Sequence, residues 1–212
     1  MKKLISAALL LGAAAAFISC GIATMPTGDE WYTKHYYVMQ DFERHAYKKL
    51  TPDARLEFQK LFWEARDPKS KSVFDERMSY VLKTYKRDNA RQPWNCDRAR
   101  IYLLNGPPND VDSTQNVNWA MSVQQAATTG VASTGGRNNE DISAVTQEVW
   151  TYRWDIYLVR YVFTFQPPND WRYSSGTGRY LGELEDWSKL NTFGIRDRAN
   201  YELRLEALKS IK

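Results

Sequence analysis

Residues 147–166 read QEVWTYRWDIYLVRYVFTFQ, and this stretch decides the fold class. Apolar and polar residues alternate over residues 147–153, which is typical of a strand with one buried face. Residues 156–166 are dense in Tyr, Val and Phe and predict a second strand. Trp154-Asp155 fits a tight turn between the two strands, and Pro167 begins the segment that closes the second one. The stretch therefore predicts two antiparallel strands joined by a turn.

The residues that follow these strands predict one more turn and then a helix. Ser174–Tyr180 contains two glycines and predicts a flexible turn ahead of a last strand. Residues 183–212 are expected to form a C-terminal helical segment. Within it, Asp197–Ile211 predicts an amphipathic helix whose apolar side consists of Tyr201, Leu205, Leu208 and Ile211.

The residues that precede the strands predict a strand and a long excursion. Arg100–Asn105 carries the apolar run Ile-Tyr-Leu-Leu and is followed by Gly106-Pro107-Pro108, which predicts a buried strand ended by a rigid turn. Residues 109–146 are rich in Asn, Ser, Thr, Gly and Ala. A segment of this length is long for a plain loop, so we expect a mobile surface excursion with a short helix near Val117–Ala127.

The N-terminal part of the chain is predicted to be helical. Residues 31–51 repeat apolar residues at spacings of three and four and predict a helical extension. Thr51-Pro52-Asp53 is a helix start, and Asp67-Pro68 ends that helix. A third helix is expected from Ser72 to about Arg91, with Phe74, Met78, Val81, Leu82 and Tyr85 on one face. Helices followed by meandering strands predict an α+β fold: N-terminal helices packed on a small, mainly antiparallel sheet, and a C-terminal amphipathic helix.

The first 19 residues have the pattern of an export signal. Basic Lys2-Lys3 precede the uncharged apolar run Leu4–Phe17. This run is shorter than the roughly 20 residues needed to span a hydrocarbon core of ~30 Å, and it suits a signal peptide. Phe17-Ile18-Ser19-Cys20 resembles the lipobox of bacterial lipoproteins. An ordinary signal peptide that happens to end in cysteine is the alternative.

The lipobox resemblance implies cleavage before Cys20 and lipid attachment to its thiol. Residues 20–30 would then be a tether. Two or more acyl chains anchor a protein firmly, so we expect the processed chain to stay on its membrane. Gly21 is not an acidic signal for inner-membrane retention. By resemblance to bacterial lipoprotein sorting, this favours the outer membrane of the cell envelope, facing the periplasm.

Composition argues against several classes of site. The net charge of +4 includes Lys2 and Lys3, and acidic and basic residues are interspersed, so we expect no nucleic-acid partner. Cys96 is the only cysteine besides Cys20, which excludes an intramolecular disulfide once Cys20 is acylated. His35 and His45 are the only histidines and would point roughly 80° apart on one helix. We therefore expect neither a metal site nor a cofactor.

Four motifs occur in a fixed order between residues 52 and 182. They are a helix end with Trp63, Arg66 and Asp67; a central run with Trp94, Asp97, Arg98, Arg100, Gly106 and Pro107; a strand with Glu148, Trp150 and Tyr152; and a turn with Gly176 and Gly178. Together they resemble the bacterial GWxTD domain family, named for a Gly-Trp-x-Thr-Asp signature. Pro93, Cys96, Ala99 and Asn105 depart from the family pattern. The family consists largely of exported proteins, often lipoproteins, with no established activity, so the resemblance implies a fold and a compartment but no reaction.

Asp97, Arg98, Arg100 and Glu148 are the residues most suited to chemistry. Two carboxylates can perform acid–base work where their environments separate the two pKa values. An arginine beside a carboxylate favours its ionised form instead, which points to a structural role. In that interpretation Asp97 and Arg98 stabilise the junction between the third helix and the strand that follows. Glu148 would pair with Arg100 or Arg153 across neighbouring strands.

Three functions are compatible with these observations. The first, which the missing catalytic motifs favour, is a non-catalytic, membrane-anchored module that binds envelope proteins. The second is an envelope hydrolase that acts on glycan or peptide with Asp97 and Glu148; a catalytic Cys96 would need a base supplied by folding. The third is a glycan-binding module that uses a flat platform of tryptophans. The structural alternative is that the tryptophans pack in the core where helices meet the sheet. It applies to Trp63, Trp94, Trp150 and Trp154.

The lipid anchor leads to a direct prediction. Cys20→Ser removes the acceptor thiol, so it should abolish labelling with a radioactive or clickable fatty acid and release the protein from membranes. Acyl labelling is the decisive measurement, because an uncut precursor could stay membrane-bound. Full labelling of the Cys20→Ser protein would contradict the assignment.

Overall fold

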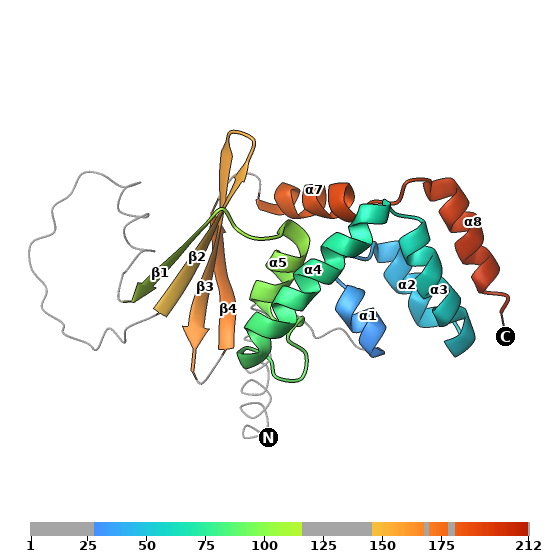
Figure 1. Cartoon of the computed structure of the whole chain (residues 1–212), viewed down its shortest axis with the longest axis horizontal. Coiled ribbons are helices and arrows are strands. Elements are labelled where there is room, and N and C mark those ends of the chain that lie inside the picture. Colours follow the sequence, from blue (N-terminus) through green and yellow to red (C-terminus); the bar gives the residue numbers. More distant parts are fainter. Residues whose placement is uncertain (1–27, 116–145, 168–169, 178–180, 212) are drawn as a thin grey trace, which may run out of the picture.

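The computed structural model describes residues 28–115, 146–167, 170–177 and 181–211 (Figure 1). Cys20 with its signal peptide, Gly178, and most of the predicted excursion, including the expected helix near Val117–Ala127, lie outside these residues.

The described residues form helices and one antiparallel sheet. The helices are α1 (Glu30–His35), α2 (Asp41–Lys49), α3 (Pro52–Glu64), α4 (Pro68–Thr84), the 3₁₀ turn η1 (Tyr85–Arg87), α5 (Asp97–Asn105), α7 (Leu181–Phe193) and α8 (Arg198–Leu208). The strands are β1 (Asp110–Gln115), β2 (Thr146–Trp154), β3 (Tyr157–Gln166) and β4 (Asp170–Thr177), in that order across the sheet. This is the predicted α+β class, with helices before and after the strands.

The two central strands confirm the opening prediction. β2 pairs with β3 from Gln147–Thr164 to Trp154–Tyr157, so the turn consists of Asp155 and Ile156. Asp155 has φ 55°, a left-handed conformation that Asp tolerates better than most residues. In Figure 1 the sheet lies at one end of the molecule, α5 lies beside it, and α8 is at the far end.

The prediction of a strand at 100–105 is wrong, because these residues belong to α5. Ile101, Leu103 and Leu104 are all buried, so α5 is apolar on nearly every side and shows no helical period in the sequence. A short apolar run cannot by itself separate a buried strand from a buried helix. Gly106, with φ 80°, ends the helix in a conformation that disfavours other residues.

The two edge strands lie where the sequence predicts an excursion, for β1, and in part a turn, for β4. β1 uses the first residues of the expected excursion and pairs along β2, although all its residues except Val111 are polar. β4 contains Ser174–Thr177, which the sequence predicts as part of a turn. The strand expected after this turn does not form in the described residues, because α7 begins at Leu181 and belongs to the helical segment expected from residue 183. An edge strand forms through backbone hydrogen bonds to its neighbour, and these bonds do not require a pattern of apolar side chains.

Helix boundaries follow local capping chemistry. Thr51 accepts a hydrogen bond from Ala54 N at the predicted start of α3, and Asp197 caps α8 in the same way. The third predicted helix begins at Pro68 rather than Ser72, because Asp67 accepts from Lys69 N and caps it. Residues 31–51 form two helices, and both contribute side chains to the main core.

A fully buried ion pair lies at the centre of the helical half. Nη2 of Arg66 lies 2.8 and 2.7 Å from the two oxygens of Glu43, and both side chains have no exposed area. Nε and Nη1 of Arg66 donate to the carbonyls of Phe193 (2.9 Å) and Phe62 (2.6 Å). Glu43 also accepts from the Tyr201 hydroxyl and from Gln40 N, each at 2.7 Å. The pair therefore connects α2, α3, α7 and α8.

Breaking this pair should destabilise the fold far more than breaking a surface pair. Arg66→Met leaves the Glu43 carboxylate buried without its cation, which costs about 3–5 kcal/mol of unfolding free energy. Arg204→Met removes the exposed contact of Arg204 with Glu64, which is worth about 0–1 kcal/mol. Urea unfolding of both variants measures the difference, and equal losses would contradict this role of Arg66.

Candidate functional site

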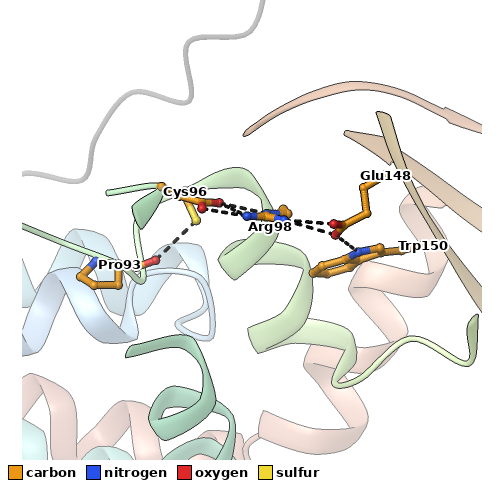
Figure 2. A network of polar contacts seen from close by, with 6 residues as sticks. Pro93, Cys96, Arg98, Glu148 and Trp150 are labelled. Atoms are coloured by element: carbon orange, nitrogen blue, oxygen red, sulfur yellow. Dashed lines mark hydrogen bonds and ion pairs between the residues drawn. The ribbon is translucent and has the colours of Figure 1, made fainter. Parts of the chain in front are cut away.

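Three of the four candidate residues lie in the first turn of α5, and the fourth lies on β2. Figure 2 shows that Arg98 points from α5 towards Glu148 on β2. Nη1 of Arg98 lies 3.3 and 3.2 Å from the two Glu148 oxygens. Arg100 instead pairs with Glu185 of α7 at 2.8 Å. The structure thus brings Arg98 and Glu148 together and directs Arg100 elsewhere.

Arg98 is held on several sides. Its Nη2 and Nε contact the carboxylate of Asp88 at 2.7–2.9 Å. The guanidinium also lies 5.0 Å from the ring centroid of Tyr85 and 4.6 Å from that of Trp171. Burial raises the pKa of Asp88, although Arg98 acts against this shift. Burial also acts to lower the pKa of Arg98, but the hydrogen bonds and charge of Asp88 raise it overall.

The two candidate carboxylates are occupied by separate partners. Besides Arg98, Glu148 accepts a hydrogen bond from Nε1 of Trp150 at 2.5 Å. Asp97 accepts from the backbone N–H of Tyr173 at 2.8 Å, which connects α5 to β4. A general acid or base must reach substrate. Here both carboxylates, together with Arg98 and Asp88, contact other parts of the protein instead and connect η1, α5, β2 and β4. The arrangement is well suited to hold the sheet against the helices.

The predicted partners of Glu148 are wrong. Arg100 faces α7 because residues 97–105 are helical, so it does not lie on a strand beside β2. Arg153 is exposed on β2, and its backbone N–H donates to the side chain of Asn109 at 2.6 Å. Sequence spacing missed Asp88, because its pairing with Arg98 depends on how η1 packs against α5.

Cys96 is unsuited to nucleophilic chemistry. Burial raises the pKa of its thiol to about 12, so the reactive thiolate is scarce near neutral pH. Its Sγ donates to the carbonyl of Pro93 at 3.4 Å (Figure 2). The thiol therefore lacks the activation that a catalytic cysteine needs.

The remaining motif residues have structural contacts. Trp94 and Trp150 are buried in the core, and Trp63 packs against it. The Tyr152 hydroxyl donates to the Gly106 carbonyl at 2.9 Å, beside the turn that contains Pro107. A Cβ at Gly176 would lie 2.4 Å from Leu181 and 2.5 Å from the Tyr173 hydroxyl, so this position needs glycine because of crowding.

The candidate tryptophans, all of which the structure describes, do not form a flat platform. Trp154 faces Trp187 of α7, with ring centroids 6.0 Å apart and planes inclined by 53°. A sugar ring stacks best where aromatic faces are exposed and coplanar. The observed inclination therefore gives the glycan-binding alternative little support.

Exposed apolar side chains lie at the tip of the β2–β3 hairpin, beside this tryptophan pair. Tyr157 pairs with Trp154 and shares its face of the sheet, whereas Leu158 lies on the opposite face. Ile156 at the tip of the β2–β3 turn is 80% exposed, and Leu158 is 47% exposed. Tyr157 and Trp187 are also exposed. We call Ile156, Tyr157, Leu158 and Trp187 the hairpin patch. The sequence predicts only a strand for residues 156–158, because their exposure depends on where the sheet ends.

His35 is buried between aromatic rings. Its ring lies 4.0 Å from that of Trp31 and 4.4 Å from that of Phe74, with interplanar angles of 16° and 21°. Its Nδ1 lies 2.7 Å from the carbonyl of Trp31. Burial lowers the pKa of His35 to about 4. In the described part of the chain, no group of three or more His, Cys, Asp and Glu side chains is arranged to hold a metal ion.

The lowered pKa of His35 predicts an acid-sensitive fold. In the unfolded chain His35 binds a proton near pH 6.5, whereas in the folded chain it binds one only near pH 4. The free energy of unfolding should therefore fall as the pH drops from 6.5 to 4. The loss attributable to His35 should approach about 3 kcal/mol at pH 4. His35→Phe should remove this part of the pH dependence, whereas His45→Gln at an exposed position should keep it. Urea unfolding from pH 7 to 4 measures both, and an unchanged slope in His35→Phe would refute the assignment.

No protein-family model, curated protein or solved structure matches the chain. Within the described ranges, no helix is both long and apolar enough to cross a membrane.

Proposed function

We propose that this chain is a bacterial envelope lipoprotein, anchored by lipid on Cys20, which works as a non-catalytic module for binding other proteins. The observation that carries the interaction role is the hairpin patch. Protein interfaces are enriched in aromatic residues and depend on a few large apolar anchors. Ile156, Leu158 and Trp187 have this character and are largely exposed.

The hydrolase alternative has less support. Asp97 and Glu148 are engaged by β4 and Arg98, and burial keeps the Cys96 thiol protonated near neutral pH. The proposal also includes the resemblance to the GWxTD family. Motif residues such as Arg66, Trp150 and Gly176 act here in packing, which fits a family defined by its fold rather than by a reaction. The outer membrane, facing the periplasm, is the proposed location.

The proposal is tested by in-cell crosslinking followed by affinity purification. Ile156→Asp and Leu158→Asp change exposed side chains, so they should leave the fold intact and remove most of the recovered partner. Leu56→Asp is the matched control, because Leu56 is 57% exposed on α3, away from the hairpin patch. It should retain the partner. An identical set of crosslinked proteins in all three variants, or none above background in the unmodified protein, would overturn the role of the patch.

A further inference from the structure

Two adjoining hollows lie on the side of α2 that faces α7 and α8. The first has a volume of about 930 Å³ and is lined by α2 and α8, including Ala46, Leu203 and Leu205. The second has a volume of about 720 Å³ and is lined by α2, α7 and the start of α8, including Lys189 and Leu190. Phe42 lines both. We call these two hollows together the α2–α8 groove.

Apolar anchors lie along the groove. Leu203 is 74% exposed in the first hollow, and Leu190 is 61% exposed in the second. Phe42 lies between them, with the guanidinium of Arg198 5.0 Å from its ring centroid. A row of exposed apolar side chains in a depression between helices is the geometry that binds the apolar stripe of another helix.

The acidic residues of the groove are mostly paired within the chain. Asp41 pairs with Arg44, Glu202 with Arg198, and Glu206 with Lys209. Among the acids that line the groove, only Asp186 forms no ion pair with a described residue.

Two lysines that line the groove form no ion pair with a described residue. Lys49 on α2 and Lys189 on α7 have no hydrogen bond or ion pair to any residue that the structure describes. Burial, and then repulsion by Arg44, lower the pKa of Lys189 to about 8, although Glu43 and Asp186 act in the opposite direction. A carboxylate placed between Lys189 and Arg44 would relieve this repulsion. Five basic side chains (Arg44, Lys49, Lys189, Arg198 and Lys209) line the groove against four acidic ones (Asp41, Asp186, Glu202 and Glu206), so the charge balance favours an acidic occupant.

We propose that the α2–α8 groove binds an amphipathic helix of a partner protein, with apolar residues along one stripe and a Glu or Asp carboxylate opposite Lys189. α8 has 11 residues, so the groove beside it accommodates roughly 16 Å, or about three turns of helix. A second copy of this chain fits less well, because two grooves that each carry an excess of basic side chains would then face each other. This inference rests on the proposed interaction function and adds a second surface to it.

Site-specific photocrosslinking in intact cells tests the occupant. A benzophenone amino acid is placed at Leu190 or Leu203, and at Leu56 as the exposed control. Crosslinks from both groove positions should map by mass spectrometry to one acidic, amphipathic segment of one partner protein, and Leu56 should give none. A basic segment, a second copy of this chain, a lipid adduct or no adduct would each overturn the proposal. If Ile156→Asp loses its partner but the groove gives no adduct, this inference fails while the proposed function stands.

Binding of the mapped segment tests the part assigned to Lys189. A synthetic peptide with that sequence should bind the purified protein, and Lys189→Met should weaken its affinity about tenfold. Lys189→Arg keeps the charge and should restore most of the affinity. Replacing the acidic residue of the peptide by Gln should weaken binding to the unmodified protein and have little effect on Lys189→Met. Thermal unfolding of each variant establishes that the fold is intact, and an unchanged affinity in folded Lys189→Met would refute the charge contact.

Discussion

The buried ion pair between Glu43 and Arg66 is the constraint on which the helical half of the molecule depends. A guanidinium removed from water costs several kcal/mol unless its donors and charge are matched. Here the groups that accept from the guanidinium come from α2, from α3 and from the last residue of α7, and Tyr201 of α8 donates to the Glu43 carboxylate. Because the donors of Arg66 have fixed directions, these four elements must adopt one arrangement for the charge to be satisfied.

A second arginine performs a similar task where the helices meet the sheet. Arg98 contacts Asp88 and Glu148 and lies close to the rings of Tyr85 and Trp171, so η1, α5 and two strands converge on one guanidinium. The proposed binding surfaces lie outside both networks. The hairpin patch lies where β2 and β3 end, and the α2–α8 groove flanks the buried pair. Glu43 and Arg66 even contribute to the electrostatic environment of Lys189.

The elements predicted correctly are those whose signals are local. Alternating residues predicted β2, a run dense in Tyr, Val and Phe predicted β3, Thr51-Pro52 predicted the start of α3, and periodicity predicted α8. The errors arose where local and tertiary signals differ. α5 is buried on nearly every side and has no amphipathic period, and β1 is a polar strand that forms because β2 offers it hydrogen-bond partners. For the candidate site, the sequence identified Arg98 and Glu148 but not Asp88, which packing alone brings to Arg98.

The sequence by itself determined the secondary structure of the central strands and most helices, the α+β class, and the lack of any familiar catalytic motif. The proposed lipid anchor at Cys20 also rests on sequence alone, because a lipobox is a linear pattern. Only the tertiary structure decided that Glu43 meets Arg66, that Arg98 connects helices to sheet, and that Leu190, Phe42 and Leu203 share a groove beside an unpaired Lys189. The physical reason is that burial, charge pairing and concave surfaces arise between elements distant in the chain, whereas caps, turns and periodicity act over a few residues.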